Sequence, residues 1–97
     1  MILRIYRARV HPGLEAEFER LFRADAVPLM QRQAGFVSFQ IGRALNGEPE
    51  LIVISQWRDL ESLQAYAGEG WQTPPVLHPG AGVLERALLE HFILPDV

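Results

Sequence analysis

The fold is decided by residues 36–57, which read FVSFQIGRALNGEPELIVISQW. Two strand-like apolar runs, 36–44 and 51–57, flank the pair Asn46-Gly47, and Asn-Gly between such runs is the strongest short-range signal for a hairpin. The second run opens with four consecutive aliphatic residues, and a strand that is apolar on both sides is covered on both faces. The sequence therefore predicts an antiparallel hairpin whose second strand is covered on both sides.

The region before this hairpin contains one strand-like and one helix-like segment. Residues 2–10 alternate loosely between two faces, whereas residues 14–33 place their apolar side chains at helical spacing. Pro28 falls inside that helical pattern and predicts a kink or a brief interruption of the helix near 24–27, because proline lacks a backbone donor and clashes with the preceding turn. Gly35 follows, and we expect it to provide the left-handed exit that helix C-termini favour.

The region after the hairpin repeats this arrangement in the opposite order. Asp59 predicts the N-cap of a helix over 60–67, which the next residue, a glycine, closes. Residues 69–82 are rich in proline and glycine and predict a long irregular connection, of a kind that usually has a function. Residues 83–87 allow one helical turn, and 88–94 read as the last strand.

The resulting order, β-α-β-β-α-β, predicts a ferredoxin-like α+β sandwich, in which a four-stranded antiparallel sheet carries both helices on one face. A chain of 97 residues has the length of one domain, so we expect residues 1–97 to form a single unit. The helices suffice to cover one face of the sheet only. Because residues 51–54 are apolar on both sides, we expect a homodimer that packs through the open sheet face.

The composition excludes several classes of function. The net charge of −3 gives no electrostatic reason to bind nucleic acid or an anionic membrane surface. The chain has no cysteine, and all nine of its basic residues are arginine, so thiol chemistry and Schiff-base lysines are excluded. No apolar run approaches the roughly 20 residues that span a bilayer. Arginines interrupt the apolar N-terminal run, unlike in a signal peptide, so we expect a cytoplasmic protein.

Several segments, in this order, resemble the antibiotic biosynthesis monooxygenase family of the dimeric α+β barrel superfamily. The resemblance covers about residues 2–67 and rests on the turn Val10-His-Pro-Gly13, the acidic helix start Leu14-Glu-Ala-Glu-Phe18, the phrase Val27-Pro-Leu-Met30, the segment Gly35-Phe-Val-Ser-Phe39, and Ser55-Gln-Trp57 before a capped helix. It implies the dimeric barrel fold. The family's activities include oxygenation of quinone precursors without a cofactor, oxidation of quinols and degradation of haem.

The haem-degrading members of this family use an asparagine on the first strand, a tryptophan on the second helix and a histidine beyond it as axial ligand. At the matching positions this sequence has Tyr6, Tyr66 and about Val76, with His78 two places away. The resemblance therefore implies cofactor-independent chemistry rather than haem degradation, and we expect no cofactor. Metal binding is not expected either, because the three histidines show none of the spacings that make a site.

A cofactor-independent oxygenase needs an apolar cavity with aromatic walls and a polar group that stabilises the substrate phenolate. We therefore predict that four residues bind a small aromatic or quinol-like substrate: Tyr6, Gln40, Tyr66 and Trp71. His78 is the predicted general base, because histidine titrates closest to neutral pH. Further polar candidates are Arg4, Gln56 and His91.

Each of these residues also has a purely structural interpretation. Trp71 either holds the 69–82 connection against the core or a partner subunit, or lies over a cavity. His91 is interpreted as a partnered strand histidine, and Trp57 as a core residue between strand and helix. Asp25 falls on the apolar helical stripe with Leu29, where its carboxylate either accepts backbone donors near the kink or lines a cavity.

Three functions remain open from the sequence. The first is a cofactor-independent monooxygenase, and it predicts that Tyr6, Trp71 and His78 converge on one cavity. The second is a non-catalytic small-ligand-binding or stress-response dimer, whose cavity would lack a titratable group. The third is a structural module without a ligand, in which these residues would be dispersed. Fold alone does not choose among them.

Overall fold

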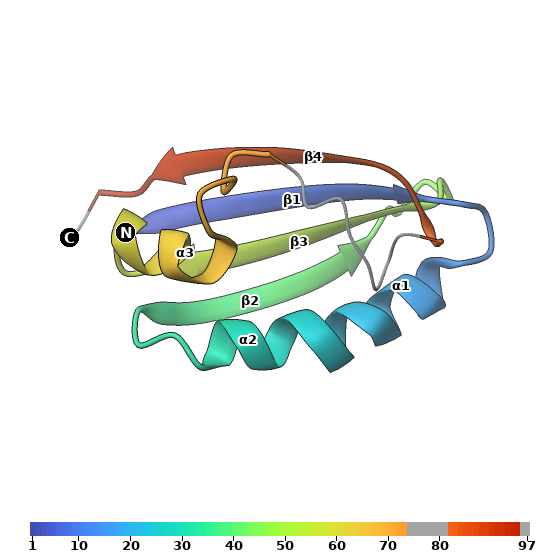
Figure 1. Ribbon diagram of the computed structural model, residues 1–97. Coiled ribbons are helices and arrows are strands. Elements are labelled where there is room, and N and C mark those ends of the chain that lie inside the picture. The colour runs from blue at the N-terminus through green and yellow to red at the C-terminus, as the bar shows by residue number, and fades with distance from the viewer. Residues whose placement is uncertain (74–81, 96–97) are drawn as a thin grey trace.

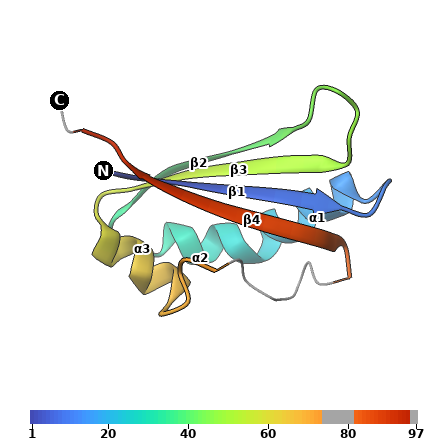
Figure 2. The same cartoon turned by 90° about the horizontal axis from the view of Figure 1, so that it is seen from above.

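The computed structural model describes residues 1–73 and 82–95. Its centre is a four-stranded antiparallel sheet in the order β2-β3-β1-β4 (Figure 1). The strands are β1 (Ile2–Val10), β2 (Phe36–Arg43), β3 (Glu50–Trp57) and β4 (Leu84–Ile93). All helices lie on one side of this sheet (Figure 2). The predicted ferredoxin-like α+β sandwich is therefore confirmed.

The β2–β3 hairpin forms where the Asn-Gly pair predicts it. Gly47 has a φ of 83°, a left-handed value that glycine adopts without strain. The Asn46 side chain accepts a hydrogen bond of 3.0 Å from the backbone N–H of Glu48 and closes the turn locally. β3 thereby comes to lie between β2 and β1.

The start of β4 differs from the prediction. The helical turn expected over 83–87 is wrong, because β4 begins at Leu84 and its residues pair with the end of β1. Ala87 lies opposite Ala8, and Leu84 lies opposite Val10 after a register shift at Arg9/Val10. β1 is nine residues long, and this pairing satisfies its backbone groups along its whole length, which local propensity at 83–87 does not reveal.

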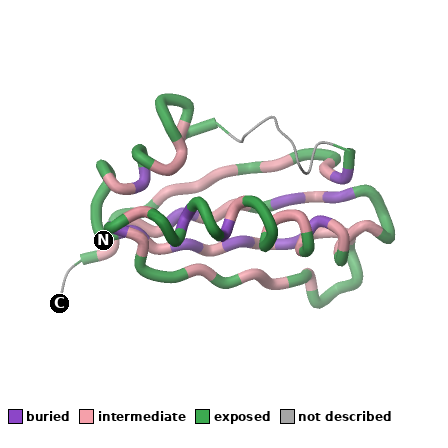
Figure 3. Tube along the Cα trace, turned by 60° about the horizontal axis from the view of Figure 1, so that its bottom comes forward, coloured by how far each residue is buried: buried purple, intermediate pink, exposed green. Residues whose placement is uncertain are grey.

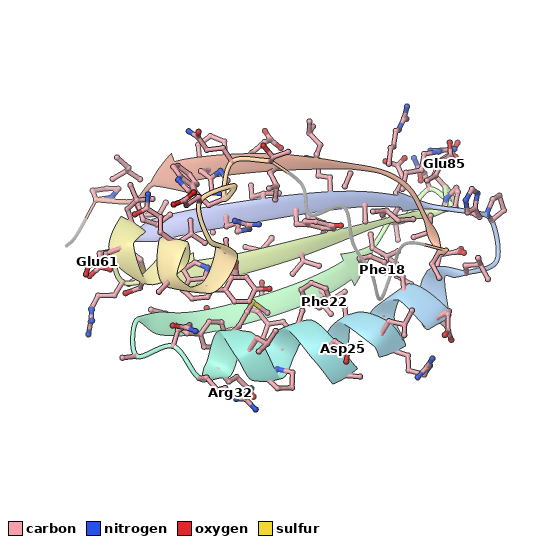
Figure 4. The ribbon with its side chains drawn as sticks, viewed as in Figure 1. Phe18, Phe22, Asp25, Arg32, Glu61 and Glu85 are labelled. Carbon is pink, nitrogen blue, oxygen red and sulfur yellow. The ribbon has the colours of Figure 1, made fainter. Side chains whose placement is uncertain are left out.

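The first helical segment is interrupted in the region that the sequence predicts. It consists of α1 (Glu15–Leu21), a π-helical stretch η1 (Phe22–Ala26) and α2 (Val27–Gln31). The N–H of Val27 donates to the carbonyl oxygen of Phe22, five residues earlier, immediately before Pro28, which has no N–H to donate. Phe18 and Phe22 point from this helix toward the sheet (Figure 4).

The π-helical stretch shifts which residues face inward. It adds one residue to a turn, so the residues after it are rotated relative to an uninterrupted helix. Val27 and Met30 are buried instead of Asp25 and Leu29. The prediction that Asp25 lies on the apolar stripe is therefore wrong, since Asp25 is exposed on the helix (Figure 4).

The second helix, α3 (Leu60–Ala67), has the boundaries that the sequence predicts. The Asp59 carboxylate accepts from the backbone N–H of Ser62 at 2.8 Å, and Gly68 follows with a φ of 80°. Gly35, in contrast, is not left-handed, so that prediction is wrong. A Cβ at Gly35 would collide with the side chain of Ser62, so this glycine permits the close approach of the α2–β2 connection to α3.

The helix-covered face of the sheet holds the core (Figure 3). One cluster of buried residues lies toward the β1–α1 turn and contains Ala8, Val10, Phe18, Leu51, Val53 and Val83. The other lies beneath α2 and α3 and contains Val27, Met30, Trp57 and Leu63. Trp57 is fully buried and its indole N–H donates to Ser55 Oγ at 3.0 Å, which confirms its predicted place in the core.

In the part of the chain that the structure describes, no helix lies on the other face of the sheet (Figure 2). Its centre is aliphatic, with Leu3, Ile5, Ile52 and Ile54 half-buried, and the exposed Leu88 and Phe92 extend it along β4. Ion pairs border this apolar centre: Arg7 with Glu90 at 2.7 Å, and Arg9 with Glu48 and Glu50 at 3.1 Å each. We call this surface the open face.

Candidate functional site

The candidate site is built around Arg4, a buried cation on the helix-covered face of β1. Strand alternation places it on the same face as Ala8 and Val10, with Ser55 of β3 and His91 of β4 as its cross-strand neighbours. Its residue exposure is only 7%. Within residues 1–73 and 82–95, no carboxylate forms an ion pair with it. A buried cation without a counter-ion is energetically costly and marks a functional candidate.

Among the described residues, Arg4 has two hydrogen-bond partners, and both are neutral acceptors. Its Nη1 donates to the backbone carbonyl oxygen of Trp71 at 3.1 Å and lies 3.4 Å from Nε2 of His91. Among the residues that the structure describes, none accepts a hydrogen bond from Nε or Nη2 of this guanidinium. Arg4 therefore joins β1, β4 and the segment after α3, while most of its donors stay available.

Two tyrosines flank this guanidinium. Tyr6 is the next inward-facing residue of β1 and its ring stacks on Phe18, with centroids 6.3 Å apart. Tyr66 comes from α3 and stacks on Trp57 at 5.1 Å. Burial raises the pKa of both phenols, and the charge of Arg4 acts in the opposite direction. Both hydroxyls are therefore protonated near neutral pH and can donate a hydrogen bond.

Trp71 and His91 form the wall of the site toward β4. The Trp71 ring meets the His91 ring edge-on, with centroids 4.9 Å apart and an interplanar angle of 79°. Both residues also line a groove of about 470 Å³ together with Ile2, Leu60 and Leu89. Burial, and then the charge of Arg4, lower the pKa of His91, so this imidazole is neutral at neutral pH. The interpretation of His91 as a partnered strand histidine is confirmed.

The structure brings together three of the five residues that the sequence predicts for the site. Tyr6, Tyr66 and Trp71 come from β1, α3 and the following segment, and each interacts with Arg4 or with its hydrogen-bond partner. Gln40 lies opposite Ile54 on the open face, on the other side of the sheet, and is exposed. His78 lies outside the described residues, so its role as a general base stays a prediction.

The sequence contains a pattern that indicates Arg4, although Arg4 is not among the five residues predicted to bind substrate or act as the base. The alternation of residues 2–10 places Arg4 on the same face as Tyr6, Ala8 and Val10, and a charged side chain in such a series is an exception to burial preferences. Its partners Trp71 and His91 are 67 and 87 residues away, so spacing along the chain does not indicate them.

This arrangement can stabilise negative charge on an aromatic molecule. A guanidinium in a poorly solvated site interacts with an anion more strongly than it does in water. The phenols of Tyr6 and Tyr66 add hydrogen-bond donors, and Trp71 adds an aromatic wall. In the described part of the chain, no group of three or more His, Asp or Glu residues could hold a metal ion. No described helix is long and apolar enough to cross a membrane.

Comparison with known proteins identifies the family. A model of the antibiotic biosynthesis monooxygenase family matches residues 1–70. A mycobilin-producing heme oxygenase from Mycobacterium tuberculosis is 32% identical, with 99% of this chain and 91% of that protein aligned. Among solved structures, the M. tuberculosis heme degrader MhuD with two hemes bound is 27% identical, with a TM-score of 0.72 over 100% of this chain and 99% of that one.

A second solved structure with the same fold is that of an oxygenase that works without a cofactor. SnoaB, a cofactor-independent oxygenase from Streptomyces nogalater, has a TM-score of 0.73 over 99% of this chain and 94% of that chain, at 21% identity. At that level of identity the likeness shows the fold alone. The family model covers more than half of this chain, and the aligned heme oxygenase covers nearly all of it. The chain therefore belongs to the antibiotic biosynthesis monooxygenase family.

Proposed function

We propose that this chain is a monooxygenase that oxidises a small aromatic or quinol-like substrate without a cofactor, in the space between the sheet and the helices. The observation that carries the proposal is the convergence of Tyr6, Tyr66 and Trp71 on Arg4. A structural module would disperse these residues, and a passive ligand site would not require a buried cation. Membership of the monooxygenase family supports this choice.

In the proposed reaction with an anthrone-like phenol, a CH2 group activated by phenolic rings loses a proton, and the charge spreads onto a phenolate oxygen. Arg4 stabilises that oxygen, with Tyr6 and Tyr66 as further donors. The carbanion adds to O2 and, after protonation, gives a hydroperoxide, which eliminates water and leaves a carbonyl group. One oxygen atom thus enters the substrate and the other enters water. His78 remains the proposed base that takes the first proton and returns it to the peroxide.

Oxygen consumption with a panel of hydroquinones and anthrone-like phenols tests this proposal. We expect turnover with at least one member of the panel, a large loss in Arg4→Gln, and a smaller loss in His78→Ala. Arg32→Gln is the matched control, because Arg32 is exposed after α2 and far from the site (Figure 4). If the wild-type protein consumes no oxygen with any of these compounds, the alternative is a ligand-binding or stress-response dimer.

Heme degradation is the second candidate, because the heme oxygenase from M. tuberculosis is 32% identical over nearly the whole chain. The described residues do not fit an iron ligand. His11 is exposed in the turn after β1, and Nε2 of His91 faces Arg4. Heme titration followed by absorbance tests this candidate: a stoichiometric Soret shift that is lost in His78→Ala would support it.

We also propose that two copies of this chain pair through the open face. The aliphatic centre of that face, bordered by ion pairs, has the composition of an interface with a polar rim. Light scattering at micromolar concentration should give the mass of a dimer. Ile54→Glu should give a monomer, whereas the matched control Leu29→Glu, on the exposed side of α2, should not. A wild-type monomer would contradict this pairing.

The cytoplasmic location is likewise proposed from the sequence.

A further inference from the structure

We propose that His91 is a positioning residue that holds Arg4 without neutralising its charge, and that the site therefore selects singly charged aromatic anions over neutral molecules of the same shape. This inference rests on the proposed function, because it concerns the same site. It adds a statement about which charge the substrate carries.

The first support is the geometry of the contact. Arg4 and His91 are direct cross-strand neighbours, so the pairing of β1 with β4 fixes their separation. Nη1 of Arg4 lies 3.4 Å from Nε2 of His91 and donates to the carbonyl oxygen of Trp71 at 3.1 Å. Because a guanidinium only donates, Nε2 is the acceptor and the imidazole proton is on Nδ1. The Trp71 ring packs edge-on against this imidazole and fixes its plane.

The second support is the contrast with the other arginines. Among the described residues, six arginines form ion pairs with carboxylates, and all are exposed except Arg9, which is half-buried: Arg7, Arg9, Arg20, Arg23, Arg43 and Arg58. Arg4 is the buried arginine, and its partners in the described chain are a backbone carbonyl and a neutral imidazole. The chain has 12 acidic residues, yet the described ones leave this cation unpaired. Neutral acceptors fix the orientation of the guanidinium but do not neutralise its charge, so that a ligand can do so.

The consequence is selectivity by charge. A phenolate or carboxylate that reaches Nε and Nη2 can accept two hydrogen bonds from the planar guanidinium and supply the missing counter-charge. A neutral ligand of the same shape leaves the buried cation uncompensated. A carboxylate at position 91 would supply that counter-charge permanently and remove this preference, whereas an uncharged amide would retain it.

The test uses a non-reacting pair of probes, 2-naphthoate and its neutral isostere 2-naphthamide, with binding measured by isothermal calorimetry at pH 7.5. We expect the wild-type protein to bind the naphthoate at least tenfold more tightly than the amide. His91→Gln retains an uncharged acceptor and should keep this ratio within about threefold. His91→Glu should bring the ratio close to one, as should Arg4→Gln, while binding of the amide persists in both. Circular dichroism verifies that each variant is folded.

Several outcomes would overturn the inference: equal affinity of the wild type for both probes, no binding of either probe, or loss of the preference in His91→Gln as in His91→Glu. The test is independent of turnover. Selective binding without oxygen consumption contradicts the proposed reaction and leaves the anion site in place. Oxygen consumption without selective binding contradicts the anion site and leaves the proposed reaction in place.

Discussion

Arg4 and Arg7 lie on the same strand, three residues apart, and on opposite faces of the sheet. Arg4 faces the helices, is buried, and contacts only neutral acceptors among the described residues. Arg7 faces away from them, is exposed, and forms a 2.7 Å ion pair with Glu90. The open face thus pairs its charges around an apolar centre, as an assembly surface does. The helix-covered face keeps one charge unpaired within a core.

This difference fits the two purposes that we propose for the faces of one small sheet, assembly on one side and ligand binding on the other. Exposed ion pairs contribute little to stability, about 0–1 kcal/mol each, but they border and orient an interface. A buried cation lowers stability, and its retention requires another reason. We place that reason in the binding of an anionic substrate. The following predictions test the contrast between the two faces, beginning with the largest expected effect.

The core beneath the helices should be far more sensitive to truncation than the open face. Trp57→Ala removes a fully buried ring and leaves the buried Ser55 hydroxyl without its donor, so we expect a loss of about 3–5 kcal/mol in the free energy of unfolding. Ile54→Ala on the half-buried open face should cost about 1 kcal/mol at dilutions where the chain is monomeric. Urea denaturation measures both values, and equal losses would contradict the contrast.

Arg4 and Arg7 should differ in their effects on turnover and on stability. Arg4→Met should lower turnover by about 10²–10³-fold, because a charged donor to the developing anion is lost, while the melting temperature does not fall. Arg7→Met removes an exposed ion pair and should change stability by less than about 1 kcal/mol, with turnover unchanged. Steady-state kinetics and thermal melting of the two variants provide the comparison. A destabilised Arg4→Met protein would indicate that Arg4 is structural.

His91 should make stability dependent on pH. Its pKa is lowered in the folded protein, first by burial and then by Arg4, so the unfolded chain binds the proton more readily. The stabilising contribution is therefore complete above the ordinary histidine value of 6.5 and is lost as the pH falls toward the folded value. His91→Gln should flatten this part of the stability curve. An acid-side slope in His91→Gln equal to that of the wild-type protein would contradict this assignment.

The sequence predicts best what depends on neighbouring residues. The hairpin at Asn46-Gly47 and the capped helix from Asp59 to Gly68 are local patterns, and the structure contains both. The burial of Val27 and Met30 could not be predicted, because it depends on a π-helical turn that the spacing of apolar residues in the sequence does not reveal.

The site shows the same limit. Alternation assigns Arg4 and Tyr6 to one face, but it does not indicate which distant residues meet them. Trp71 and His91 reach Arg4 only because β4 pairs with β1 and the segment after α3 lies against that pair. Long-range pairing, rather than local propensity, therefore builds the site.

Gln40 gives the smallest expected effect and the most direct test of which face binds substrate. The sequence predicts that it binds substrate, and the structure places it on the open face, opposite Ile54 and away from Arg4. If the site lies only on the helix-covered face, Gln40→Ala should leave kcat/KM within about twofold, since surface substitutions away from a site change energies little. Tyr66→Phe, on the other face, should lower it severalfold, because it removes a hydroxyl beside Arg4. A comparable loss in Gln40→Ala would mean that the open face, through a partner subunit, contributes to the site after all.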